Sequence, residues 1–147
     1  FELLKFSYSL KQQLSSPRKI YLVDSAFNKV CGLSFTPNKG RNLENAVFVE
    51  LKRKKGEIFY HAEKYECDFI IKKGTEITAA MQVCYSLDES NKEREIKGLV
   101  EAMDKFKLKE GIILTLEQAD DILIEGKKIK VLPAARWMME SKDIIKK

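Results

Sequence analysis

The sequence has too few cysteines, histidines and long apolar runs for several common classes of protein. Its three cysteines, Cys31, Cys67 and Cys84, are widely spaced and form no Cys-x-x-Cys pair. Because His61 is the one histidine, the chain lacks the clustered ligands of a structural zinc site. No apolar stretch approaches the ~20 residues of a membrane-spanning helix. Free cysteines in apolar segments favour a reducing compartment, so we expect a cytoplasmic protein with no membrane partner.

Glycine is also scarce, with seven residues in all, and the phosphate-binding sequence Gly-x-x-x-x-Gly-Lys-[Ser/Thr] is absent. We therefore expect no ATP site in this chain. The residues that are present are 44% hydrophobic and 33% charged, which is enough to build a folded core within 147 residues. The net charge of +5 is mildly basic, so it permits contact with DNA without requiring it.

The hydrophobic patterns predict an α/β domain around a mixed sheet. Apolar residues recur at helical spacing over 88–108, and the strand at 110–116 follows at the distance of a parallel crossover. Two short strands surround Gly126, and a last helix begins near Ala134. Before them we expect, in order, a strand within 3–14, a strand at 19–24, a helix at 25–33, a loop at 34–42, a helix at 43–55 capped by Asn42, a strand at 57–62 and a hairpin at 67–87.

The second strand of this hairpin carries polar residues where core residues are expected. Gln82 and Cys84 share one of its faces, because a strand sends residues i and i+2 to the same side. If the hairpin loop has three residues centred on Gly74, Asp68 pairs with Ala80 and lies diagonal to Gln82. The hairpin is therefore predicted to gather an aspartate, a glutamine and a thiol on one face.

Each of these residues also has an ordinary structural explanation. Gln82 and Cys84 can be core residues, with the amide bonded to the backbone. Asp68 can make a turn contact. Glu44, on the preceding helix, stands near an N-terminus, where the helix dipole favours a carboxylate. It also lies on the flank that carries Phe48, which predicts that it points towards the protein.

Five stretches of the chain together resemble a known family: "RKIYLVDSAF", "GRNLENAVFVELKRKKGEIFYHAEKYECDFII", "MQVCYSLDESNKEREIKGLVEAM", "EGIILT" and "KIKVLPAARWM". They look like the C-terminal domain of archaeal and bacterial AAA-type ATP-binding proteins, a PD-(D/E)XK nuclease-like domain long labelled as of unknown function. The resemblance implies a restriction-endonuclease-like mixed sheet flanked by helices. It also implies that residues 17–147 are this domain and that residues 1–16 are the remnant of a preceding winged-helix region.

In that superfamily a glutamate on the first core helix, an aspartate on the second strand and a Glu-x-Lys pair on the third form a Mg²⁺ site. The metal polarises a phosphate and lowers the pKa of an attacking water. The resemblance assigns Glu44, Asp68 and Gln82 to the metal positions and Cys84 to the position of the lysine. Cys84 lacks the permanent cation of lysine, so we expect a degenerate catalytic site. A weaker expectation is that Lys97, on the following helix, supplies the missing cation.

Three functions remain open at this point. The first is an accessory domain of a P-loop ATPase that contacts DNA, or a protein partner such as the ATPase and winged-helix domains of its parent chain. The second is an active Mg²⁺-dependent DNA endonuclease. The third is a protein-interaction or assembly domain without nucleic acid, whose exposed apolar surface could drive a homodimer. If DNA is bound, the predicted contacts are the basic residues Lys52, Arg53, Lys54 and Lys55.

Overall fold

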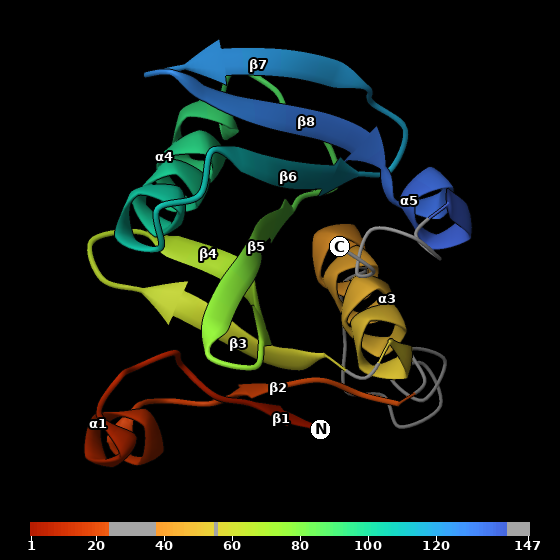
Figure 1. Cartoon of the computed structure of the whole chain (residues 1–147). Coiled ribbons are helices and arrows are strands. Elements are labelled where there is room, and N and C mark those ends of the chain that lie inside the picture. Colours follow the sequence, from red (N-terminus) through yellow and green to blue (C-terminus); the bar gives the residue numbers. More distant parts are fainter. Residues whose placement is uncertain (24–37, 55, 141–147) are drawn as a thin grey trace.

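The structure is a computed structural model that describes residues 1–23, 38–54 and 56–140, and it contains a mixed sheet between helices (Figure 1). Helix α4 (Lys92–Lys105) covers one face of the sheet, whereas α3 (Lys39–Arg53) and α5 (Ala134–Glu140) lie on the other. The predicted α/β class is confirmed, with the mixed sheet flanked by helices that characterises restriction-endonuclease-like folds. Within the described residues, none of the helices is long and apolar enough to cross a membrane.

The main sheet has six strands in the order β3-β4-β5-β6-β8-β7. Strands β5 and β6 run parallel and are connected through α4, as the crossover spacing predicted. Strands β6 and β8 are also parallel, and the other neighbouring pairs are antiparallel. The bounds are β3 Glu57–Ala62, β4 Glu66–Lys73, β5 Glu76–Val83, β6 Glu110–Thr115, β7 Asp120–Ile124 and β8 Lys127–Pro133.

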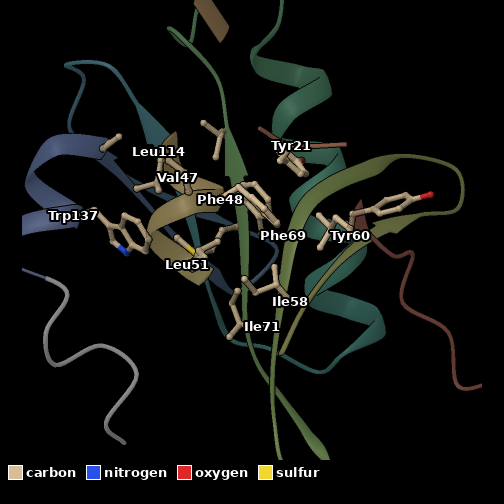
Figure 2. Close-up of a cluster of buried hydrophobic side chains, with 14 residues drawn as sticks. Tyr21, Val47, Phe48, Leu51, Ile58, Tyr60, Phe69, Ile71, Leu114 and Trp137 are labelled. Carbon is tan, nitrogen blue, oxygen red and sulfur yellow. The ribbon is translucent and has the colours of Figure 1, made fainter. Parts of the chain in front are cut away.

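Two hydrophobic clusters fill the space on the two faces of the sheet. Strand β5 and the residue after it supply both, because Met81 and Val83 join the cluster under α3, while Ala80 and the following Cys84 join the cluster under α4. This alternation confirms the predicted faces of the strand. Figure 2 shows the first cluster, in which side chains of α3 pack on the sheet and Trp137 of α5 lies at the edge. Burial of each large apolar side chain contributes about 1.5–3 kcal/mol.

The N-terminal segment runs beside the edge of the main sheet near β3 (Figure 1). Its elements are β1 (Glu2–Leu3), α1 (Leu10–Ser15) and β2 (Lys19–Ile20), and β1 pairs with β2 in an antiparallel ladder. The strand predicted within 3–14 is therefore wrong over α1, because the Ser9 hydroxyl accepts a hydrogen bond from the Gln12 N–H and caps a helix. The strand predicted at 19–24 is shortened to two residues. Leu3 and Phe6 from this segment are buried in the domain.

Helix α3 begins before the predicted start. Asn38, rather than Asn42, is its N-cap, and the Asn38 side chain accepts a hydrogen bond from the Arg41 N–H. The loop predicted at 34–42 is thus helical from Lys39 onwards, which brings Arg41 and Glu44 into the first turns. The helix predicted at 25–33 lies outside the described residues.

The hairpin of β4 and β5 has a different register from the predicted one. Lys73 pairs with Glu76 around a two-residue turn, and Thr78 is then inserted as a bulge in β5. Each change shifts the pairing by one residue, so Ala80 lies opposite Ile70 instead of Asp68. The two shifts add up to two residues, and residues two apart on a strand point to the same face. Asp68 therefore keeps its predicted side of the strand.

Candidate functional site

Strands β4 and β5 separate beyond the pair Phe69–Met81, which is the last pair of their ladder in this direction. Beyond this pair, hydrogen bonds between side chains and the backbone replace the backbone hydrogen bonds of the ladder. The Asp68 N–H donates to Gln82 Oε1 at 3.1 Å, and the Val83 N–H donates to Asp68 Oδ2 at 3.0 Å. Immediately after β5, the Cys84 N–H donates to the Leu114 carbonyl of the neighbouring strand β6. The separation of the two strands opens the floor of a cleft.

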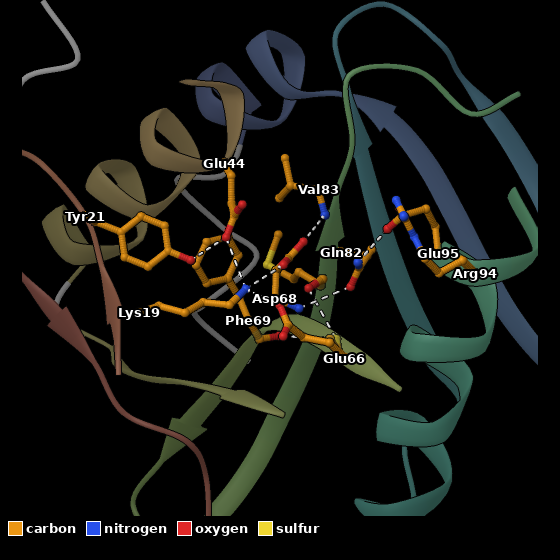
Figure 3. Close-up of polar contacts among 12 residues, drawn as sticks. Lys19, Tyr21, Glu44, Glu66, Asp68, Phe69, Gln82, Val83, Arg94 and Glu95 are labelled. Atoms are coloured by element: carbon orange, nitrogen blue, oxygen red, sulfur yellow. Dashed lines mark hydrogen bonds and ion pairs between the residues drawn. The ribbon is translucent and has the colours of Figure 1, made fainter. Parts of the chain in front are cut away.

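A lysine ammonium occupies this floor and contacts three carboxylates (Figure 3). Lys19 Nζ lies 2.8 Å from Asp68 Oδ1, 3.2 Å from Glu44 Oε1 and 2.6 Å from Glu66 Oε1. The Lys19 side chain is 21% exposed and that of Asp68 is 8% exposed, so the pair is shielded from water. Such short, partly buried charge-assisted contacts are stronger than surface ion pairs.

The electrostatic environment of Asp68 and Lys19 reflects this burial. Burial raises the pKa of Asp68 from its ordinary 3.8 to about 6, against the lowering effect of Lys19. Burial by itself would lower the pKa of Lys19, but the negative charges of Asp68 and Glu44 outweigh it and raise that pKa. Lys19 therefore stays charged at neutral pH, while Asp68 holds a proton more readily than an exposed aspartate.

Glu44 reaches the cluster from α3, and the prediction that it points towards the protein is confirmed. The Tyr21 hydroxyl also donates to Glu44 Oε1, and the Tyr21 ring stacks on Phe48 with 4.1 Å between ring centroids. Burial raises the pKa of Tyr21, so its hydroxyl keeps its proton and remains a donor. The structure thus brings Glu44 and Asp68 together, but through the shared ammonium of Lys19.

Gln82 turns towards α4 instead of presenting a free oxygen to the cleft. Its Oε1 accepts the Asp68 N–H, and its Nε2 donates to Glu95 Oε2 at 2.6 Å. Glu95 is itself buried and accepts a second contact of 2.6 Å from the exposed guanidinium of Arg94. Glu95 therefore places a buried carboxylate beside Gln82.

Cys84 is buried in the α4-side cluster and supplies no cation. Burial raises the pKa of its thiol to about 12, and the nearby Glu95 and Asp68 add to this effect. The thiolate form is the reactive one, so Cys84 is a poor nucleophile at neutral pH. Lys97, the relocated cation considered from the sequence, pairs with Glu93 on the outside of α4 and does not line the cleft.

The cleft has a volume of about 1390 Å³, which exceeds the ~300–1000 Å³ of pockets for small molecules. Its buried lining combines the acidic or amide residues Asp68, Gln82 and Glu95 with less polar residues such as Tyr21 and Val83. Its exposed lining includes the acidic Glu66 and several neutral residues, and four basic residues from separate parts of the chain: Arg18, Arg41, Lys64 and Arg94. An acidic floor under a basic rim can hold a cation below and phosphates above.

The basic residues predicted from the sequence lie elsewhere. Lys52, Arg53 and Lys54 stand at the C-terminal end of α3, and none of them lines the cleft. The Lys54 ammonium lies 4.4 Å from the centre of the Trp137 ring. Lys55 lies outside the described residues. DNA contact through this group stays a prediction, while the cleft offers a different set of cations.

The donor set of the cleft floor does not fit Mg²⁺ as it stands. Two carboxylates of the predicted metal set, Glu44 and Asp68, are bonded to Lys19, and the Gln82 oxygen is bonded to the backbone. A divalent ion would need three or more oxygens, so Lys19 would have to leave first. Among the described residues, a separate group of His61, Glu63 and Glu101 lies outside the cleft. His61 bonds Glu101, Glu63 accepts from Lys105, and Glu101 also accepts the Tyr65 N–H.

Sequence reasoning missed several residues of this site, and Lys19 and Glu95 matter most among them. Lys19 meets Asp68 across 49 positions of the chain, so no local periodicity could indicate the contact. Glu95 had a weak signal. It stands in the first turn of α4 on the side of Leu99, which is a buried position for a carboxylate and therefore requires a partner.

Comparison with known proteins gives one informative relative. No protein-family model matches the chain, and no solved structure matches it. The chain is 38% identical over 150 residues to the uncharacterized protein MJ1544 of Methanocaldococcus jannaschii. The match covers 95% of this chain but 33% of the relative, so the chain spans about a third of that protein's length.

Proposed function

We propose that this chain is a nuclease-fold accessory domain of a larger ATP-binding protein, and that its cleft contacts DNA without cleaving it. The observation that carries the proposal is the Lys19 ammonium on the cleft floor, which engages oxygens of the carboxylates that a catalytic metal would need. The basic rim supports contact with phosphates, because arginine and lysine side chains neutralise the backbone of nucleic acids.

The setting of the domain is part of the same proposal. The relative MJ1544 is about three times as long as the matched region, which agrees with ATPase and winged-helix domains as partners within one chain. Cys67 and Cys84 are free and buried, which agrees with a reducing cytoplasm.

A second candidate is a Mg²⁺-dependent DNA endonuclease, and Lys19 is also the observation that favours it. Its ammonium stands beside Asp68, where it could offset charge on a phosphate in the way that Cys84 cannot. In this case Glu44 and Asp68 would hold the metal, which would polarise the phosphate and lower the pKa of an attacking water. Lys19 would then contact the substrate instead of the two carboxylates.

The two candidates are separated by incubating the protein with plasmid and branched DNA in Mg²⁺ or Mn²⁺. Asp68→Ala is the test variant, and Asp121→Ala, on the exposed strand β7, is the matched control. We expect binding that weakens steeply with salt and no cleavage by any of the proteins. Cleavage that is lost in Asp68→Ala alone would establish the endonuclease. If the protein neither binds nor cleaves DNA, the role moves to protein contact through the exposed apolar residues Tyr8, Leu10 and Leu14.

A further inference from the structure

Two tyrosines stand at the cleft where β4 and β5 separate. Tyr65 immediately precedes β4, and Tyr85 follows β5 by two residues. Continued in the same register, the ladder would place these two residues opposite each other. Because the strands part, the tyrosines instead line the cleft from its two separate strands, and both rings are partly exposed.

The backbone of each tyrosine is fixed by a neighbouring element. The Tyr65 N–H donates to both carboxylate oxygens of Glu101 on α4, at 3.2 Å each. The Tyr85 carbonyl accepts the Leu116 N–H, just beyond β6, at 3.1 Å. The rings are thus presented on a preorganised frame, which limits the entropy that a ligand would have to offset on binding.

Each tyrosine also has a lysine ammonium near its ring. Lys39 Nζ lies over the Tyr85 ring, 5.2 Å from its centroid. Lys64 Nζ and Lys97 Nζ lie over the Tyr65 ring, 5.5 Å and 5.8 Å from its centroid. Aromatic rings with cations near them are the combination that binds single strands, since bases stack on exposed ring faces and phosphates meet the cations. Base faces in a duplex are already stacked on their neighbours, so such a pair favours unpaired bases.

We propose that the cleft binds a single-stranded segment of nucleic acid, with Tyr65 and Tyr85 as stacking platforms for unpaired bases. The inference rests on the proposed DNA contact and specifies its substrate class. The basic rim contacts the phosphates. The two tyrosines stack on bases at the two sides of the cleft, Tyr65 beside β4 and Tyr85 beyond β5. The acidic floor and Lys19 lie between them and limit how deeply the phosphates enter.

Fluorescence anisotropy with labelled oligonucleotides tests this assignment. The probes are one DNA strand, the same strand annealed into a duplex, and the RNA strand of the same sequence. The variants are Tyr65→Leu and Tyr85→Leu, which keep apolar volume without a ring, and Tyr65→Phe and Tyr85→Phe, which keep the ring. Tyr8→Leu, at a residue that is 82% exposed and does not line the cleft, is the control. Thermal melts confirm that each variant is folded.

We expect the wild-type protein to bind the single strand more tightly than the duplex. Each Leu variant should bind the single strand about tenfold more weakly, while the Phe variants and Tyr8→Leu stay within about twofold of wild type. Equal or tighter binding of the duplex, or Leu variants that bind like wild type, would overturn the stacking assignment and leave the DNA-contact proposal standing. Loss of binding to every probe in the wild type would overturn both. Tighter binding of the RNA strand than of the DNA strand would support the stacking role of the tyrosines and identify the ligand as RNA.

Discussion

At the scale of single residues, Lys19 decides the chemistry of the site. Three carboxylates converge on one ammonium, so oxygens that could hold a metal are already engaged by a side chain of the protein itself. The same contacts make Lys19 structural, because removing one partner of a shielded ion pair leaves the other without compensation.

Lys19→Met should therefore lower the free energy of unfolding by about 2 kcal/mol at neutral pH, which is below the usual range for a fully buried pair because Lys19 retains some exposure. Urea denaturation measures the change. Lys72→Met is the matched control, since the Lys72–Glu57 pair lies at the surface, and it should cost less than about 0.5 kcal/mol. Equal effects of the two substitutions would contradict a special role for Lys19.

A metal should bind the Lys19→Met variant more readily than the wild type. If the ammonium and a divalent cation compete for the Glu44 and Asp68 oxygens, Mn²⁺ should raise the Tm of Lys19→Met by several degrees and leave the wild type nearly unchanged. The double variant Lys19→Met/Asp68→Asn should lose the response. A Tm rise of similar size in the wild type would show that Lys19 yields to the metal.

The pKa of Asp68 gives a pH dependence of stability in metal-free buffer. Its folded value of about 6 lies above the ordinary 3.8, so the folded protein holds an extra proton between these values. The contribution of Asp68 to the free energy of unfolding is therefore greatest at low pH and decreases as pH rises from about 4 to 6. Urea midpoints measured across this window should decline less steeply in Asp68→Asn than in wild type. Parallel profiles would show that the pKa of Asp68 is ordinary.

At the scale of elements, the close packing of α4 on β4 positions one wall of the cleft. A Cβ on Gly98 would stand 2.0 Å from the Glu66 carbonyl oxygen, which is closer than any side chain can approach. The helix residue Glu95 and the strand residues Glu66 and Asp68 keep their spacing because this position has no side chain.

Gly98→Ala should thus destabilise the protein by about 3 kcal/mol, since the contact is with backbone and cannot be relieved by a rotamer change. Gly40→Ala in α3 is the control, because its nearest neighbour would be 3.7 Å away. A helical alanine at that position should raise stability by up to about 1 kcal/mol. Thermal melts of both variants decide the matter, and a Gly98→Ala protein as stable as wild type would refute the close approach.

The elements also show what the sequence could and could not predict. The strand–helix–strand unit and the two faces of β5 were predictable, because helical and alternating periodicities are local. The start of α3 was misplaced because Asn38 and Asn42 are both good caps. The hairpin register was wrong because a two-residue turn and a bulge at Thr78 leave no periodic signal. Lys19 was missed because its partners are distant in the chain.

At the scale of the whole molecule, two groups of basic residues have different consequences for DNA contact. One group follows the cleft rim, and the other stands at the C-terminal end of α3, where the sequence predicted DNA contact. The long-range field of the protein depends on both groups, but only the first lies over the acidic floor and the two tyrosines. A homodimer stays a prediction, and the exposed side chains Tyr8, Leu10 and Leu14 near α1 are the surface on which to seek it.

The most direct test of the central claim compares two double charge reversals for DNA affinity over a range of salt. Arg41→Glu/Lys64→Glu changes the cleft rim, and Lys52→Glu/Arg53→Glu makes the same change of charge at exposed residues of α3. If the cleft binds DNA, the rim variant should lose at least about tenfold in affinity and show a smaller salt dependence, while the α3 variant stays within a few-fold of wild type. Normal binding by the rim variant together with weak binding by the α3 variant would contradict the cleft assignment.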